Sequence, residues 1–253
     1  MQFQIISNEP IANLVYEMQL KGDTRQISKP GQFVQLQLPG FYLRRPISIC
    51  DWRTDENGVL QLVFKVVGKG TEEMATYSSG MELDLLVGLG NGYDINQTGE
   101  ANKSQHPLLV GGGVGVPPLY GLCKKLIASG KKPKVVLGFN AKKDVFFKQE
   151  FEDLGVQVLV TTVDGSEGIK GFVTDAIALL ENQYDYIYTC GPEPMLKAVH
   201  AQAEKKNIAG QYSFEERMAC GFGACMGCSC HTKYGAKRIC KDGPVLMAEE
   251  IIW

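Results

Sequence analysis

The feature that most constrains this chain is a concentration of cysteines near its C-terminal end. Five of the eight cysteines lie between residues 220 and 240, and the other three are scattered along the rest of the sequence. From about residue 214 onward the sequence shows neither the two-residue period of a strand nor the longer period of a helix. The cysteine cluster therefore needs a chemical reason rather than a packing one.

The spacing of these cysteines supplies that reason. Cys220, Cys225 and Cys228 form the pattern C-x4-C-x2-C, and Cys240 follows. Plant-type ferredoxins hold a [2Fe-2S] cluster with four thiolates in this arrangement. Glycines between the cysteines let the loop curl, so that backbone N–H groups point at the cluster sulfurs. We predict these four cysteines as the metal ligands and Cys230 as a neighbouring, unligated thiol.

Zinc, disulfides and ordinary buried thiols compete with a cluster. A zinc site also uses four sulfurs, but structural zinc usually shows two tight pairs, and only Cys225 and Cys228 form one here. Disulfides require an oxidising compartment, and the start MQFQIISNEP has neither a basic leader nor an apolar signal core. Buried unligated thiols usually occur singly, which is the expectation for Cys50 and Cys123.

Composition and charge exclude several functional classes. With 44% hydrophobic and 21% charged residues, the chain has an ordinary globular balance rather than that of a disordered, collagen-like or coiled-coil protein. A net charge of -2 gives no reason to expect nucleic acid or an anionic membrane as a partner. No apolar run approaches the roughly 20 residues that span a bilayer. We expect a cytoplasmic chain.

Periodicity divides the chain into three modules. In the first, Gln35 and Gln37 alternate with apolar residues, and Leu60, Leu62 and Phe64 share one face of a later run. This alternation indicates a small antiparallel barrel. In the second, short apolar strands alternate with helical segments, which indicates a parallel α/β sheet. The prediction is an α+β multidomain chain with a β-barrel over 1–100, an α/β domain over 101–213 and a small cysteine domain over 214–253.

Two segments of the barrel module have the chemistry of a diphosphate site. RRPIS (44–48) lies where a strand should run, and an arginine fork can donate two parallel hydrogen bonds to a phosphate. GKGT (68–71) precedes a helical stretch, where free N–H groups and the helix dipole favour an anion. Taken alone, the first is equally a solvated strand edge and the second simply a turn. Together, beside a cysteine motif, they predict one diphosphate held from both ends.

Two segments of the second module predict a dinucleotide site. LLVGGGVGVPP is a strand, a glycine-rich turn and a helix start, although it is not the plain G-x-G-x-x-G pattern, and many such turns carry glycine for packing only. The segment beginning CGP, at 190, ends a later strand and is expected at the same sheet edge. Without this context Cys190 is a buried strand-end thiol. The predicted contacts are Gly111, Gly112, Gly113, Gly115, Cys190, Gly191 and Pro192.

In this order the motifs resemble those of the ferredoxin-reductase flavoprotein superfamily, and most closely the electron transfer subunits of class 1B dihydroorotate dehydrogenases. The resemblance covers nearly the whole chain: RRPIS and GKGT, GGGVGVPPL and CGPEPML, DGSEGIKGFVTD, and ERMACGFGACMGC with CKDGPV. It implies FAD on the barrel, NAD on the α/β module and a [2Fe-2S] cluster on the last module.

The resemblance also implies roles for single residues. Arg45 contacts the FAD diphosphate and Ser48 lies near flavin N5, while Ile47 stands where plant-type reductases carry a stacking aromatic. Cys190 stands near the hydride-transfer position, so Ser48 and Cys190 are the catalytic candidates. The remaining flavin contacts implied are Pro46, Val63, Phe64, Lys65, Gly70 and Thr71.

The implied function is a redox relay. FAD exchanges a hydride with NAD and single electrons with the cluster, which passes them to or from a partner. Because the sequence shows no pocket for an organic acid, the resemblance implies a separate FMN-containing subunit that oxidises dihydroorotate to orotate in pyrimidine biosynthesis, in a heterotetramer of two of each chain. Lys142 and Lys143 could meet the 2′-phosphate of NADPH, but the resemblance favours NADH.

Two alternatives to this relay stay open from the sequence. One is a reductase component that feeds an oxygenase or a sulfide-dehydrogenase-like complex. The other is a non-enzymatic, zinc-stabilised nucleotide-binding regulator without a flavin.

Overall fold

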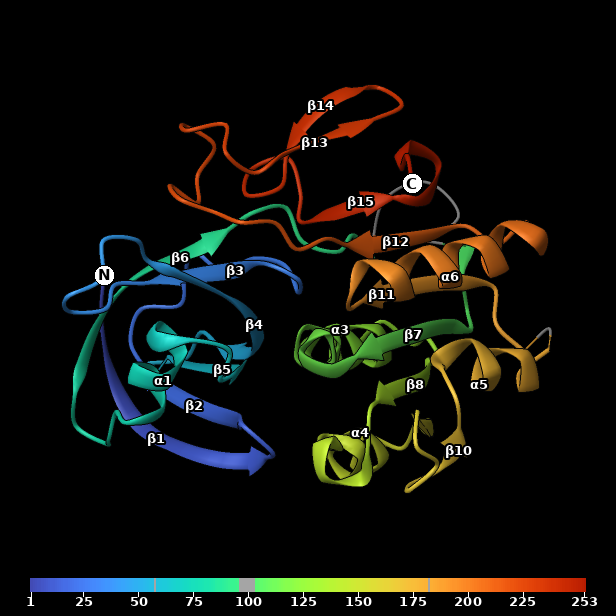
Figure 1. The fold of residues 1–253 in the computed structure, drawn as a ribbon, viewed down its shortest axis with the longest axis horizontal. Coiled ribbons are helices and arrows are strands. Elements are labelled where there is room, and N and C mark those ends of the chain that lie inside the picture. The colour runs from blue at the N-terminus through green and yellow to red at the C-terminus, as the bar shows by residue number, and fades with distance from the viewer. Residues whose placement is uncertain (57, 96–102, 182) are drawn as a thin grey trace.

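The structure is a computed structural model that describes residues 1–56, 58–95, 103–181 and 183–253. A closed β-barrel is followed by a seven-stranded sheet with helices on both faces, and a two-stranded hairpin lies beside both (Figure 1). The predicted combination of an antiparallel barrel, an α/β module and a small C-terminal cysteine module is confirmed.

The barrel has the strand order β1-β2-β5-β4-β3-β6, and every neighbouring pair is antiparallel. Val34 and Leu36 point into the barrel core together with Leu60, Leu62 and Phe64, as the alternation predicts. Its elements are β1 (Gln2–Ala12), β2 (Val15–Lys21), β3 (Phe33–Leu36), β4 (Arg45–Arg53), β5 (Val59–Lys65), α1 (Lys69–Ala75) and β6 (Glu82–Leu89).

The sheet has the order β10-β9-β8-β7-β11-β12-β15. Its pairs are parallel except for the last, in which β15 of the cysteine module runs antiparallel to β12. Every residue of β7 is buried because helices cover both faces. The strands are β7 (Pro107–Gly112), β8 (Lys134–Phe139), β9 (Gln157–Thr162), β10 (Ile169–Lys170), β11 (Tyr186–Cys190), β12 (Gly210–Ser213) and β15 (Val245–Met247).

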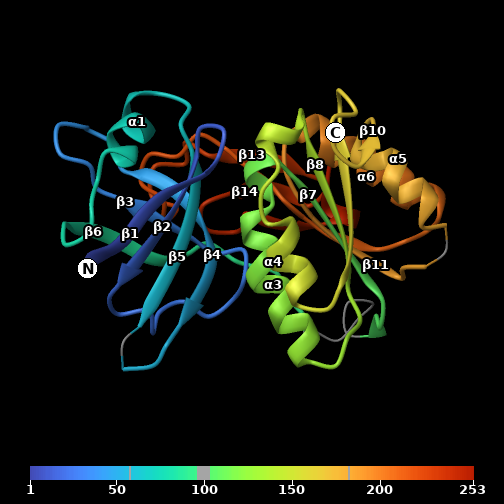
Figure 2. The same ribbon diagram turned by 90° about the horizontal axis from the view of Figure 1, so that it is seen from below.

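Helices α3 and α4 pack on one face of the sheet, and α5 and α6 on the other (Figure 2). The predicted proline start of α3 is confirmed, because Pro117 and Pro118 occupy its first turn. The helices are α3 (Pro117–Ala128), α4 (Lys148–Asp153), α5 (Val173–Leu179) and α6 (Glu193–Lys205), with short 3-10 turns η1 (Gly113–Gly115), η2 (Lys142–Asp144) and η3 (Ala248–Glu250).

The modules share their cores. Helix α3 packs against β4, where Cys50 and Cys123 are buried in one apolar cluster and Lys124 forms an ion pair with Asp51. A second cluster joins Phe33 of the barrel to Cys228 and Cys240 and to the α5–α6 face of the sheet. The last module also carries the hairpin of β13 (Ser229–Thr232) and β14 (Gly235–Arg238). Across the described ranges, no helix is both long and apolar enough to cross a membrane.

Candidate functional site: a cleft between three modules

A cleft of about 790 Å³ lies where the three modules meet. It is bordered by the start of β4, by the turn after β11 and by the cysteine module, so each predicted module contributes to one space. The GKGT turn, the glycine turn at 111–115 and the four predicted cluster ligands lie outside its lining. Residues 214–218 also line it, and sequence reasoning missed them because they follow no periodic pattern. Predicted site residues in the lining are Arg45, Pro46, Gly191 and Pro192, with the spare Cys230 beside them.

A second cleft, of about 650 Å³, lies at the opposite edge of the sheet. Lys134 and Gln157, which begin β8 and β9, contribute to its wall, and none of the predicted site residues does. Open α/β sheets bind ligands at the carboxyl ends of their strands. The cleft between the modules is therefore the candidate site.

The structure brings the two predicted diphosphate segments together. Arg45 begins β4, and its guanidinium lies against Gly70 in the first turn of α1, where a Cβ atom would stand 2.2 Å from Arg45 Nε. A side chain at this position would displace the guanidinium. The ring of Phe41 supports the guanidinium from another side, 4.7 Å from its central carbon. Arginine and glycine turn together form a cradle that fits a diphosphate.

Thr71 shapes this turn rather than pointing freely out of it. Its hydroxyl oxygen accepts hydrogen bonds from the backbone N–H groups of Val67 (2.9 Å) and Gly68 (3.2 Å). The hydroxyl in turn donates to the carbonyl oxygen of Gly68 at 3.0 Å. These bonds fix the backbone that carries Gly70 beside Arg45.

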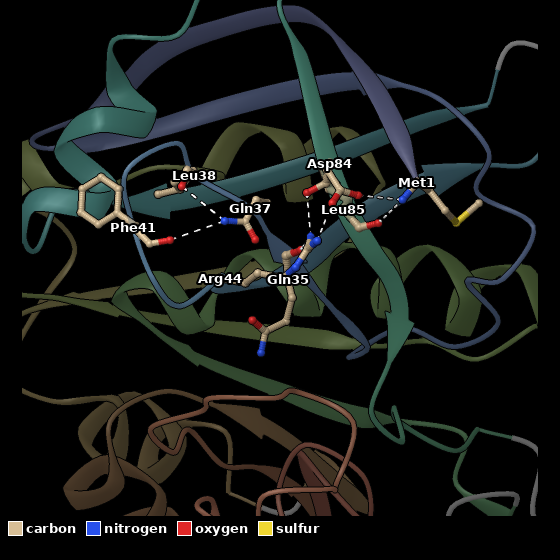
Figure 3. Close-up of polar contacts among 8 residues, drawn as sticks. All are labelled: Met1, Gln35, Gln37, Leu38, Phe41, Arg44, Asp84 and Leu85. Atoms are coloured by element: carbon tan, nitrogen blue, oxygen red, sulfur yellow. Dashed lines mark hydrogen bonds and ion pairs between the residues drawn. The ribbon is translucent and has the colours of Figure 1, made fainter.

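The first arginine of RRPIS has a structural role. Arg44 forms an ion pair with Asp84 and donates to the carbonyl oxygens of Asp84 (3.0 Å) and Gln35 (3.3 Å) (Figure 3). The pKa of the Asp84 carboxyl is lowered, first by the N-terminal ammonium of Met1 and then by Arg44. Arg44 thus ties β3 to β6, and Arg45 is the arginine that faces the glycine turn.

The other predicted flavin contacts lie on neighbouring strands, β4 and β5. Ile47 and Ser48 are half-buried on β4 opposite Val34 and Phe33 of β3. The ring of Phe64 lies in the barrel core and stacks on Tyr16 at 5.7 Å between ring centroids. Any contact between Phe64 and a cofactor would therefore come from its backbone. Val63, by contrast, is buried in the core that the barrel shares with the sheet, and Lys65 is half-buried.

The two predicted nucleotide segments lie side by side, because β7 and β11 are parallel neighbours and Gly111 is opposite Cys190. A Cβ atom on Gly115 would stand 2.3 Å from the carbonyl oxygen of Cys190, so the glycine turn rests directly on the end of β11. Gly112 and Gly191 both approach the side chain of Met195 in α6. In η1 Gly113 is half-buried and Val114 is the exposed residue of the turn.

Burial raises the pKa of the Cys190 thiol to about 12, against the lowering effect of a hydrogen bond with Ser213. Cys190 is therefore a neutral thiol at neutral pH and not a nucleophile. A small, uncharged side chain at the end of β11 is compatible with a position beside a nicotinamide ring.

The cysteine loop directs backbone donors at its sulfurs. Cys220 Sγ accepts from the N–H groups of Ala224 (3.3 Å) and Cys225 (3.5 Å), and Cys228 Sγ accepts from that of Cys240 (3.3 Å). Burial opposes ionisation of Cys220, but the backbone N–H groups of Cys225, Phe222 and Ala224 and the thiol of Cys225 outweigh it and lower its pKa to about 6. Donors around ionised thiolates are what an iron–sulfur cluster requires.

The four sulfurs form two pairs, with the thiol of Cys220 beside that of Cys225 and the thiol of Cys240 beside that of Cys228. A structural zinc needs four ligands about one ion, whereas a two-iron cluster is held by cysteines on two irons. The donor set fits a [2Fe-2S] cluster. Cys230 lies apart, opposite Lys237 in the hairpin.

Comparison with known proteins agrees with this geometry. Residues 215–252 match the iron-sulfur cluster binding domain of dihydroorotate dehydrogenase B, and residues 109–201 match the oxidoreductase NAD-binding domain. A Fusobacterium nucleatum protein named dihydroorotate dehydrogenase B (NAD(+)), electron transfer subunit, is 44% identical over 96% of this chain and 95% of its own length. A Bacillus pumilus protein of the same name is 43% identical over 98% and 96%.

This chain belongs to the family of dihydroorotate dehydrogenase B electron transfer subunits. The predicted family is thus confirmed. It is an oxidoreductase family whose name implies a partner catalytic subunit. The cofactor prediction is confirmed as an iron–sulfur cluster-binding domain and an NAD-binding domain in a flavin-reductase-like fold.

Solved structures extend the comparison. The structure of an NADH-dependent reduced ferredoxin-NADP oxidoreductase, described in terms of flavin-based electron bifurcation, has a TM-score of 0.88 and 32% identity over 99% of this chain and 90% of that one. Phthalate dioxygenase reductase has a TM-score of 0.62 and 19% identity over 81% and 64%, which shows a shared fold alone.

Proposed function

We propose that this chain carries electrons between NAD(H) and a separate FMN-containing dihydroorotate dehydrogenase subunit, by way of FAD and a [2Fe-2S] cluster. One observation carries the proposal: a single cleft is bordered by the flavin segment, the nucleotide segment and the cysteine module. FAD, when bound, supplies the exchange between electron pairs and single electrons.

Separate groups of residues in this chain bind FAD, the dinucleotide and the cluster. Arg45 and the turn at Gly70 hold the FAD diphosphate, and Ser48 lies toward the reactive part of the flavin from β4. The glycine turn from Gly111 to Gly115 receives the dinucleotide beside the neutral thiol of Cys190. The N–H groups of the cysteine loop bind the cluster sulfurs. We retain 1–100, 101–213 and 214–253 as the proposed flavin, NAD and cluster domains.

The proposed partner binds at the cysteine loop. Phe222 and Met226 of this loop are 56% and 55% exposed, although both are large and apolar. Apolar side chains that flank a redox centre suit a protein partner rather than a charged surface such as nucleic acid. We propose two copies of each chain in the assembly, and the cytoplasm as its location because the cysteine ligands must stay reduced.

The test of the proposed function is an anaerobic titration of the purified chain with NADH. The flavin absorbance should bleach and the electron paramagnetic resonance (EPR) signal of a reduced cluster should rise as NADH is added. Addition of the purified catalytic subunit with orotate should then reoxidise both centres. A colourless, zinc-containing protein would contradict the proposal, as would a reduced chain that orotate and the catalytic subunit leave unchanged.

The ligand assignment makes a separate prediction. Serine at Cys220, Cys225, Cys228 or Cys240, changed singly, should lower cluster content from about one per chain to near zero, because a hydroxyl is a poor replacement for a thiolate on iron. Iron and sulfide analysis measures this content. Cys230→Ser is the matched control from the same module and should keep the cluster. Loss of the cluster from this control would refute the assignment.

A further inference from the structure

The side chain of Gln35 joins the flavin barrel to the cysteine loop. Gln35 lies on β3 between Val34 and Leu36, whose side chains fill the barrel core, so Gln35 points to the opposite face. Phe33, two residues earlier on that face, is buried in the core that contains Cys228. The side chain of Gln35 is itself completely buried. It therefore faces the cysteine module and not solvent.

The cysteine loop lies directly on this carboxamide. A Cβ atom built on Gly221, the residue after Cys220, would stand 2.3 Å from Gln35 Nε2. Gly221 also has a φ of +78°, in the left-handed region that favours glycine. In Figure 3 the side chain of Gln35 points away from Arg44 and Asp84, while that of Gln37 turns toward Leu38. The approach to the loop is specific to Gln35.

Both polar atoms of the Gln35 side chain are available for hydrogen bonds to the cysteine loop side. Among the described residues, neither Nε2 nor Oε1 of Gln35 has a hydrogen-bond partner, whereas both amide atoms of buried Gln32 and Gln211 are bonded. Burying an amide without hydrogen bonds is unfavourable. A cluster held by Cys220 would place an anionic sulfur acceptor on the Gly221 side, where the Nε2 donor lies.

We propose that Gln35 Nε2 donates a hydrogen bond to a cluster sulfur on the Cys220 side and thereby raises the reduction potential of the cluster. The inference rests on the proposed function, because it requires the cluster. A donor to sulfur stabilises the negative charge that an added electron brings. Gln35 is opposite Pro46 of the flavin segment, so this bond acts on the side of the cluster that faces the barrel.

The test is an EPR-monitored redox titration of the purified, cluster-loaded chain. Gln35→Met fills nearly the same volume without the donor, and the ratio of reduced to oxidised cluster at a given potential should fall about tenfold. For a one-electron couple this is a midpoint about 59 mV lower. Gln35→Glu should lower it further, because a carboxylate repels the added electron. Gln35→His, which restores an N–H donor, should recover at least half of the shift.

The matched control is Gln37→Met, on the same face of the same chain segment but bonded to Leu38 and Phe41. Its potential should equal that of the wild type. A wild-type potential in loaded Gln35→Met would overturn the inference, as would loss of the cluster from Gln35→Met that Gln35→His fails to restore. Failure of the proposed function has a different signature, since the wild-type chain itself would then lack a cluster or an NADH-reducible flavin.

Discussion

Arg45→Ala should yield a chain that binds FAD at least about 100-fold more weakly and is purified largely without flavin. The fork donates two charge-assisted hydrogen bonds, and each is worth about 1.5–3 kcal/mol. Arg45 forms one side of the cradle over Gly70, so its removal takes the fork from the diphosphate and leaves the turn intact. The ratio of FAD to protein, and a fluorescence titration of the flavin-free chain with FAD, measure the effect. Cluster content should stay at its wild-type value.

The control for this experiment is Arg25→Ala, which removes an equal charge from the same barrel. Arg25 forms an ion pair with Asp23. Its side chain is 82% exposed and belongs to neither of the proposed diphosphate segments. This variant should bind FAD as the wild type does. Arg45→Lys separates charge from geometry: it keeps the charge without the planar fork and should fall between the two. Wild-type FAD affinity in Arg45→Ala would show that the diphosphate lies elsewhere.

The sequence predicts which side chains are buried wherever a local pattern determines the structure. Alternation placed Leu60, Leu62 and Phe64 on one face of a strand, and all three are buried in the barrel core. For Phe64 the alternation predicts a side chain in the core, whereas the family resemblance places the residue along the flavin, which stays a prediction. The two agree if the backbone of Phe64 makes the contact, since its ring is buried in the barrel core and β4 pairs with β5 only from Val59 to Leu62.

Other features depend on contacts between distant segments, which no local pattern contains. Strand β15 has three residues, Val245–Met247, too few to show a period, and it joins the sheet because β12 offers an unpaired edge. The alternation of polar and apolar residues predicts that Gln35 faces outward from the barrel. In the structure it does so, but it is buried because the cysteine loop packs on it. The chemistry of the residues predicts that Arg45 and the glycine turn act together, whereas the cleft that Arg45 shares with Gly191 is seen only in the fold.

Gly115→Ala should abolish reduction by NADH while leaving flavin and cluster in place. The new Cβ atom would stand 2.3 Å from the carbonyl oxygen of Cys190 and 2.6 Å from the backbone nitrogen of Gly191. These backbone atoms at the end of β11, which is paired with β7, cannot give way by a rotamer change, so the glycine turn must move off the end of β11. Misplacement of reacting groups by about 1 Å costs about 100-fold in rate. Stopped-flow measurement of flavin reduction should show at least that loss.

The same substitution should also lower the free energy of unfolding by about 1–3 kcal/mol, the usual cost of overpacking, so stability must be separated from placement. Gly155→Ala is the control for this purpose: it lies in the same module with a φ of +79° and no atom within 4 Å of its Cβ position. It should lose comparable stability and keep NADH reduction. Dithionite should reduce the flavin equally in both variants. If Gly115→Ala accepts hydride from NADH at the wild-type rate, the dinucleotide does not lie on this turn.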